Sequence, residues 1–277
     1  MKIFKTVIKH AVLIIFSIYS LFPIFYIVMA SFKSNREFLE GGSGILPKVW
    51  QVSNFVEIWN KANFSLYTYN SLYVSFVSML GVLLISSVMA YCLERLDFKF
   101  KKIIIGAYMG TMFMVGVTNI YPIFELFVKT GLNKTLNGLV FAKLGAQAFN
   151  TFLIMRFLAT IPREIDESAK MDGCSFIHRY WRIILPLLKP ILATIAILTF
   201  NASWNDYMLP MAFTLSNESL RTLTVAVVAL KNQMNTAITS YSMMFAGASI
   251  SLVPIIVVFA FMNKQVINGI VAGAVKG

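Results

Sequence analysis

Charged residues are scarce in this chain of 277 residues: Asp, Glu, Lys and Arg make up 13% of it, whereas hydrophobic residues make up 58%. Soluble domains usually carry about 25% charged residues. A soluble core cannot bury such an excess of apolar surface, so lipid must solvate much of the chain. The composition excludes an ordinary soluble domain and predicts a membrane protein.

Cysteine and histidine are also rare, with two of each. Cys92 and Cys174 form no disulfide framework. His10 and His178 are far apart and have no clustered carboxylates or cysteines beside them, which argues against a metal site or a histidine-based catalytic centre. The sequence also lacks a Gly-x-x-x-x-Gly-Lys-Ser/Thr phosphate loop. We therefore expect no enzyme activity, no metal and no cofactor bound by this chain itself.

Long apolar runs are abundant. A helix of roughly 20 apolar residues spans a bilayer. At about 20 residues, the first run exceeds the roughly 7–15-residue apolar core of a cleaved signal peptide, so we expect a retained anchor. The runs predict an all-α, polytopic membrane protein with six transmembrane helices: His10–Ala30, Ser71–Tyr91, Ile103–Ile123, Gly138–Leu158, Leu187–Met208 and Tyr241–Met262.

Ionisable side chains are nearly absent inside these runs. A charge at the bilayer centre costs at least ~2.5 kcal/mol and usually marks an ion or proton path. Glu94, Glu125, Lys143, Arg156 and Asp206 all lie near predicted ends of the runs. This distribution argues against a proton-coupled secondary transporter, although sodium sites can be built from carbonyls and hydroxyls.

The positive charges favour one orientation in the membrane. If both termini are cytoplasmic, 15 Lys and Arg residues lie on the cytoplasmic side and eight in the outer loops. Lys and Arg concentrate in cytoplasmic loops. We therefore predict a multi-pass protein of the cell membrane with both termini cytoplasmic. The same distribution argues that the net charge of +12 reflects topology and not a nucleic-acid partner.

A polar island, Pro162–Pro186, separates the fourth and fifth runs. Thr160 can cap a helix whose first turn is acidic, and Gly173 can end that helix in the left-handed conformation. These signals predict a cytoplasmic helix over Pro162–Asp172. Taken alone, they fit an ordinary solvated hairpin equally well.

The island predicts two further structural features. Asp166 and Lys170 are four residues apart with the acid first, which favours an ion pair along the helix. A second helical stretch is expected over residues 175–185, with Phe176, Tyr180 and Ile184 on one side.

The spacing of the island resembles the cytoplasmic EAA loop of importer-type ATP-binding-cassette permeases. Glu167-Ser168-Ala169 is followed after three residues by Gly173 and after nine more by Ile183-x-Leu185-Pro186, with Ser168 the one departure from Glu-Ala-Ala. The resemblance implies that residues 160–190 dock on a separate ATPase, with Glu167 as an anchor and with Ala169 and Gly173 allowing close approach. The coupling residues that it implies are Glu164, Glu167, Ser168, Ala169, Asp172, Gly173, Ile183, Leu185 and Pro186.

The resemblance extends over nearly the whole chain. The stretches Phe200-Asn-Ala-Ser-Trp204-Asn-Asp-Tyr-Met-Leu-Pro210, Thr222-Leu-Thr-Val and Gly273-Ala-Val-Lys-Gly277 resemble the maltose-permease-like branch of carbohydrate permeases. The resemblance implies that residues 1–277 form one transmembrane domain of an ATP-driven sugar importer. The partners it implies are a second related permease, two ATPase subunits that bind the ATP, an extracellular or periplasmic solute-binding protein, and membrane lipid.

The end of the fifth run permits two interpretations. Asn201, Trp204, Asn205 and Asp206 form either an aromatic belt with a polar helix cap at the outer interface or the rim of a translocation path. Asn201 and Asn205 share a helical face, which favours a water-filled path. Two alternatives stay open: an importer for another solute, such as glycerol phosphate, and, less favoured, a stand-alone secondary sugar carrier. The sequence leaves the particular sugar open.

Overall fold

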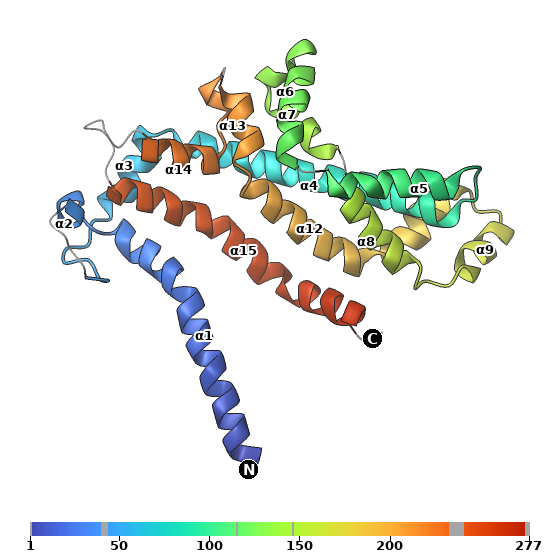
Figure 1. Ribbon diagram of the computed structural model, residues 1–277, viewed down its shortest axis with the longest axis horizontal. Helices are drawn as coiled ribbons and strands as arrows, with labels where there is room; N and C mark the ends of the chain where they lie inside the picture. The colour runs from blue at the N-terminus through green and yellow to red at the C-terminus, as the bar shows by residue number, and fades with distance from the viewer. Residues whose placement is uncertain are drawn as a thin grey trace. The chain divides into compact units, whose positions relative to one another are not determined.

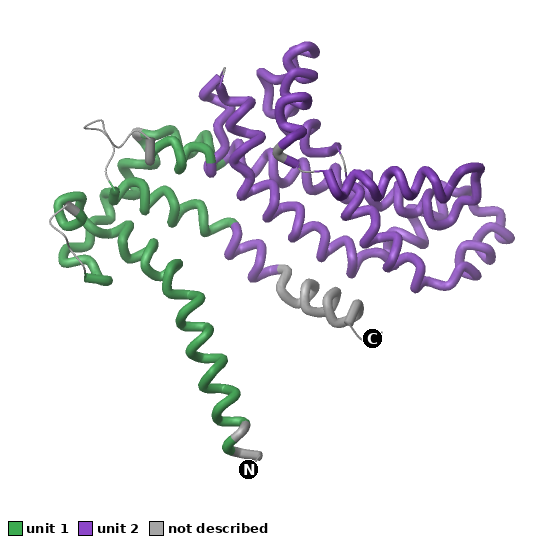
Figure 2. Tube along the Cα trace, in the orientation of Figure 1, with its two compact units in different colours: residues 1–68, 225–254 green, residues 69–224, 255–277 purple. Residues whose placement is uncertain are grey.

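The computed structural model describes residues 2–39, 44–114, 116–145, 147–215, 217–232 and 241–274, and every regular element in these ranges is a helix (Figure 1). The all-α prediction is confirmed. The chain divides into unit 1 (Met1–Thr68 and Val225–Pro254) and unit 2 (Tyr69–Thr224 and Ile255–Gly277), coloured separately in Figure 2.

Unit 1 is held together by a buried amide and a close helix contact. Its elements are α1 (Lys2–Ser31), α2 (Asn35–Leu39), α3 (Ser53–Lys61), the start of α4 (Phe64–Arg95), most of α14 (Leu223–Asn232) and the first part of α15 (Tyr241–Ala274). The buried Asn54 amide donates to the carbonyls of Ser31 (2.8 Å) and Lys33 (2.9 Å). Gly247 allows α15 to approach closely, because a Cβ there would lie 2.8 Å from the side chains of Ile58 and Phe64.

Unit 2 contains the rest of α4 and α15 and all elements between residues 101 and 220. These are α5 (Lys101–Gly110), η1 (Thr111–Phe113), η2 (Gly116–Asn119), α6 (Ile120–Lys129), η3 (Leu132–Lys134), α7 (Leu136–Leu144), α8 (Ala148–Leu158), α9 (Glu164–Met171), α10 (Phe176–Arg179), the π-helix η4 (Tyr180–Ile184), α11 (Leu185–Leu187), α12 (Lys189–Trp204), α13 (Met208–Thr214) and η5 (Glu218–Leu220). One apolar cluster joins Tyr91 of α4 and Leu158 of α8 to Ile184 and to Ile195 of α12.

Among the described residues, three helices are long and apolar enough to cross a membrane: α1 over Thr6–Ser31, α4 over Phe64–Arg95, and α15 over Tyr241–Phe261. They carry the first, second and sixth predicted spans, so these three helices are confirmed. None of the best span window of α1 is buried inside the described chain. Such a long apolar surface requires lipid or another protein chain around it.

The third predicted span, Ile103–Ile123, is wrong as a single helix. α5 ends at Gly110, two 3-10 turns follow, and Met114 is extended (ψ 125°) before α6 begins at Ile120. Pro122 accounts for part of this break, because it has no N–H to donate to the Thr118 carbonyl and its ring opposes a helix passing through that turn.

The fourth predicted span, Gly138–Leu158, is a bent pair of helices, whereas the fifth, Leu187–Met208, holds α12 and starts at a bend that precedes it. α7 and α8 differ in direction by 51° across the extended Gly145, and the helical segment Phe176–Leu187 meets α12 at 78°. At the second bend, Pro190 has no N–H to donate to the Pro186 carbonyl. The described chain thus has three continuous candidate spans, or five if each bent pair is one span. The count of six stays a prediction.

Candidate coupling loop and polar cavity

The predicted coupling helix is present as α9. It spans Glu164–Met171, inside the predicted bounds Pro162–Asp172, and three acidic residues occupy its first turn, where the helix dipole favours negative charge. The predicted cap is wrong: the Thr160 hydroxyl donates to the Phe157 carbonyl (2.7 Å) and belongs to the end of α8. Figure 1 shows α9 beyond the C-terminal end of α8.

Gly173 ends α9 as predicted. Its φ of +80° is left-handed, the Cys174 N–H donates to the Ala169 carbonyl (3.0 Å), and the Gly173 N–H donates to that of Lys170 (3.1 Å). This pair of bonds is a Schellman motif. Among the described residues, no heavy atom lies within 4 Å of a Cβ built on Gly173. The backbone conformation therefore requires glycine, and the space outside it is open.

The Glu-Ser-Ala residues face in different directions. Glu167 and Ser168 are exposed, as is Asp172, whereas Ala169 is only 5% exposed and packs inside unit 2. The small side chain at position 169 is explained by packing within this chain. The expectation that Ala169 makes room for an ATPase is therefore corrected.

Asp166 lies at the centre of a buried ion-pair cluster. Its Oδ2 is 3.0 Å from Arg95 Nε, and its Oδ1 accepts a hydrogen bond from the Tyr91 hydroxyl (2.7 Å). Arg179 Nη1 lies 3.9 Å from the same Oδ1 and donates to the Asp166 carbonyl (3.2 Å). The expected pairing with Lys170 is therefore wrong, because two guanidinium groups in a low-dielectric setting attract the carboxylate more strongly than an exposed lysine does.

Arg95 extends this cluster to the end of α8. Its Nη2 donates to the carbonyls of Leu158 (3.3 Å) and Ile161 (2.7 Å). One turn earlier, Tyr91 stacks on Phe176 of α10 with ring centroids 4.6 Å apart. Helices shorter than about 12 residues are marginal in water. The position of α9 is therefore determined by these tertiary contacts with α4, α8 and α10.

The second half of the loop packs against the rest of unit 2. The Ser175 hydroxyl accepts the N–H of His178 (3.3 Å) and caps α10. Ile183 and Leu185 are half-buried against the apolar cluster, whereas Pro186 is exposed. The predicted shared side of Phe176, Tyr180 and Ile184 faces the interior of unit 2, because Tyr180 and Ile184 are buried and Phe176 stacks on Tyr91.

The outer side of the loop is apolar as well as acidic. Met171 is 87% exposed, and Ile177 and Trp181 are also exposed, in the same loop as the exposed Glu167. Exposed large apolar side chains rimmed by polar residues are typical of protein–protein contact sites. The loop thus combines a rigid attachment with a surface suited to another protein.

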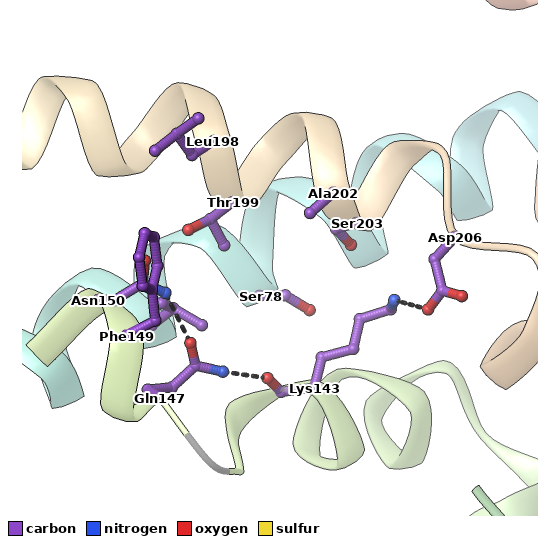
Figure 3. A pocket seen from close by; sticks show the side chains of 11 residues that line it. Ser78, Lys143, Gln147, Phe149, Asn150, Leu198, Thr199, Ala202, Ser203 and Asp206 are labelled. Carbon is purple, nitrogen blue, oxygen red and sulfur yellow. Dashed lines mark hydrogen bonds and ion pairs between the residues drawn. The ribbon is translucent and has the colours of Figure 1, made fainter. Parts of the chain in front are cut away.

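Unit 2 also contains a cavity of about 440 Å³, lined from α4, α7, α8 and α12 (Figure 3). Most of its lining surface is apolar, and we call it the polar cavity after the ion pair, hydroxyls and amides that it contains. Lys143 extends across it and forms an ion pair with Asp206, just after α12. Gln147 donates to the Lys143 carbonyl (2.8 Å) and accepts from the Asn150 amide (2.8 Å). Asp206 Oδ1 also accepts the N–H of Leu209 (3.4 Å), as expected for a polar cap on the following helix.

The four predicted path residues are divided by the structure. Asp206 lines the polar cavity, whereas Asn201 lines a more apolar cavity of about 500 Å³ between α12 and α15. Asn205 donates to Asn201 Oδ1 (2.7 Å), so these amides share a face as predicted. Trp204 is buried and stacks on Phe200 with centroids 5.8 Å apart, so its ring is not at a rim of unit 2. A path role for Asn201 and Asn205 stays a prediction.

Tyr91, Arg95 and Lys143 belong to these sites but were not predicted from the sequence. Tyr91 and Arg95 share a helical face at the end of α4, and Lys143 and Asp206 are opposite charges near the ends of predicted spans. These signals do not identify partners, because Tyr91 and Asp166 are 75 residues apart and Lys143 and Asp206 are 63 apart.

Some sequence-based predictions concern residues that the structure does not describe. Gly42 in the first outer segment and residues 275–277 of the terminal motif lie outside the described residues. Within the described ranges, no group of three or more His, Cys, Asp or Glu side chains is placed to hold a metal ion.

The fold defines a class: an all-α, multi-pass membrane protein. The family model described as "binding-protein-dependent transport system inner membrane component" matches residues 2–266, and the chain belongs to this family.

Individual proteins show the same likeness. The probable ABC transporter permease protein YurM of Bacillus subtilis is 32% identical over 92% of this chain and 84% of its own length. The diacetylchitobiose uptake system permease protein NgcG of Streptomyces coelicolor is 27% identical over 97% of this chain and 88% of its own. A chain of a bacterial ABC transporter involved in import of the acidic polysaccharide alginate has the same fold, with a TM-score of 0.81 at 23% identity over 95% of this chain and 96% of that one.

Proposed function

We propose that this chain is the permease subunit of an ATP-driven sugar importer and forms half of its translocation path. The observation that carries the proposal is the coupling loop: α9 is fixed to α4, α8 and α10 through Asp166 and presents Glu167 and an open Gly173 outward. The importer mechanism requires a loop of this kind, because the energy source is a separate protein.

The partners follow from the family and the loop. We infer a second related permease, two ATPase subunits that bind the ATP, and an extracellular or periplasmic solute-binding protein. This chain contributes no catalytic residue and no ATP site. Both termini are placed in the cytoplasm, so that the coupling loop and the ATPases lie on the same side of the membrane.

The coupling step is mechanical. When ATP binding draws the ATPases together, the docked α9 moves with them. The buried Asp166–Arg95 ion pair transmits this displacement to the end of α4, because breaking it would leave charges uncompensated in a desolvated site. The spans then change from inward-facing to outward-facing.

A sugar is the favoured solute. Diacetylchitobiose is named for one relative that aligns over nearly the whole chain. A permease for another solute, such as glycerol phosphate, would share the same coupling loop, so substrate assays decide between them. The docking loop argues against a stand-alone carrier. Uptake that persists without the ATPase would support the stand-alone carrier instead.

The substitution Gly173→Trp tests the proposal, with Gly131→Trp as a matched control. Both glycines are left-handed, at φ +80° and +72°, and both have open space around a built Cβ among the described residues. The conformational cost of roughly 1–2 kcal/mol is therefore similar at the two positions. Only Gly173 lies in the proposed dock.

ATP-driven uptake and the amount of inserted protein are measured for both variants. Gly173→Trp is expected to abolish uptake, or to release the ATPase subunits, while the protein stays inserted. Gly131→Trp is expected to retain uptake. Equal retention of uptake in both variants would contradict the docking assignment.

A further inference from the structure

The polar cavity contains hydroxyl groups that the chain does not satisfy. Ser78 is 1% exposed and Ser203 is 8% exposed, and neither hydroxyl, nor that of Thr199, has a hydrogen-bond partner among the residues that the structure describes. Serine in a helix often donates to a carbonyl one turn earlier. A buried hydroxyl without a partner is costly. A polar occupant of the cavity would supply the missing hydrogen bonds.

The charge of the cavity is balanced. Lys143 and Asp206 are the two charged side chains among its described lining residues, and they pair with each other. Their side chains are 11% and 24% exposed, so solvent screens the pair only in part. The remaining polar groups are neutral hydroxyls and amides, and Phe149 adds an aromatic surface. Figure 3 shows Lys143 lying across the cavity toward Asp206, with Ser78 beside it.

We propose that this cavity binds a neutral sugar unit in passage and that the Lys143–Asp206 pair excludes acidic sugars. The proposal rests on the proposed function and specifies its substrate class. Sugar hydroxyls both donate and accept, as do the free hydroxyls of Ser78, Thr199 and Ser203. A volume of about 440 Å³ lies within the range of small-molecule sites.

Charge pairing provides the selectivity. A sugar carboxylate entering this cavity would lose its hydration without gaining a free cation, because the Lys143 ammonium is already paired. The Asp206 carboxylate would also repel it. A neutral sugar incurs neither cost and can hydrogen-bond to the ion pair without breaking it.

Cysteine labelling tests the hydration and charge of the cavity without knowledge of the sugar. Ser203→Cys is introduced into the full complex in membranes, with Cys92 and Cys174 replaced by serine. Its modification rates are measured with a trimethylammonium and with a sulfonate methanethiosulfonate reagent. Both reagents are expected to react, and the ratio of the two rates is the readout.

The charge variants should shift this ratio in opposite directions. Asp206→Asn is expected to favour the sulfonate reagent several-fold, and Lys143→Met the trimethylammonium reagent several-fold. Glu125→Gln, which removes an exposed charge paired with Lys129 outside the cavity, is the control and should leave the ratio unchanged. The double variant Lys143→Met/Asp206→Asn should restore the parental ratio, which separates charge from misfolding. Failure of Ser203→Cys to react, or an unchanged ratio in both single variants, would overturn the proposal.

A growth assay tests the substrate class. A host strain lacking this chain is grown on neutral oligosaccharides and on uronate oligosaccharides, with and without a plasmid copy. Loss of growth confined to the neutral sugars is expected. Loss on the uronates would overturn the charge selection alone and leave the importer function standing. If growth is lost on neither kind of sugar, both the proposed sugar importer function and the assignment of the cavity to a sugar are overturned. The cysteine-labelling result on the hydration and charge of the cavity does not depend on this assay.

Discussion

Asp166→Ala is the most direct perturbation of the coupling loop. It removes the acceptor for the Tyr91 hydroxyl (2.7 Å) and the partner of Arg95 (3.0 Å), and it leaves Arg179 without its nearest carboxylate (3.9 Å). The Asp166 and Arg95 side chains are 9% and 6% exposed. Water therefore cannot replace the lost interactions without rearrangement of the loop.

The cost follows from this burial. Removing one partner of a buried ion pair typically destabilises by about 3–5 kcal/mol. The eight residues of α9 are too few for a stable isolated helix, so the loss should appear as undocking of α9. Since about 1.4 kcal/mol is a factor of ten, the open population should rise by about 100-fold or more.

Hydrogen exchange of the α9 amides in the membrane-embedded complex measures that population. Protection over Glu164–Met171 should fall by about 100-fold in Asp166→Ala, and transport per ATP hydrolysed should fall with it. Asp172→Ala, an exposed acid at the end of the same helix, should change protection by no more than a few-fold. Wild-type protection in Asp166→Ala would refute the view that this ion pair fixes the coupling helix.

Three further predictions concern topology, the path and packing. In intact cells, Gly42→Cys should react with an impermeant thiol reagent and Ser175→Cys should not; the reverse pattern would invert the topology. Asn201→Leu should lower uptake by about fivefold with normal assembly, the effect of one hydrogen bond of ~1 kcal/mol, and unchanged uptake would remove Asn201 from the path. Gly138→Ala should lower the thermal stability of the purified protein, with a free-energy cost of at least the ~1–3 kcal/mol of an overpacked site, because its Cβ would lie 1.9 Å from a backbone carbonyl oxygen. Gly106→Ala, with open space at its Cβ among the described residues, should be neutral by the same thermal-stability measurement, and equal stabilities would contradict the packing argument.

Short-range sequence signals predicted the features of this protein that depend only on residues close together in the chain. The apolar runs predicted α1, α4 and α15, because a spanning helix satisfies its own backbone within one segment. Gly173 predicted the end of α9, because only a residue without a Cβ adopts φ +80° at little cost. The Glu167-to-Pro186 spacing indicated the family for a similar reason, since the loop is contiguous in the chain.

The interruption of the third predicted span shows where local reasoning fails. The run Ile103–Ile123 is mostly apolar and has no charged residue, yet α5 and α6 are separate helices with 3-10 turns between them. Apolar composition reports solubility in lipid and does not report backbone continuity. Pro122 was a visible signal, but its effect depends on whether surrounding elements satisfy the freed carbonyls.

Composition, helix periodicity and the loop motif sufficed to predict a membrane-embedded, all-α transport subunit with a polar loop over Pro162–Pro186. Only the tertiary structure decided that Asp166 pairs with Arg95 instead of Lys170, that Ala169 faces inward, and that Lys143 meets Asp206 across a polar cavity. The physical reason is distance along the chain. Helix signals act over three or four residues, whereas an ion pair between residues more than 60 positions apart depends on how bent helices pack, and hydrophobic periodicity does not encode that geometry.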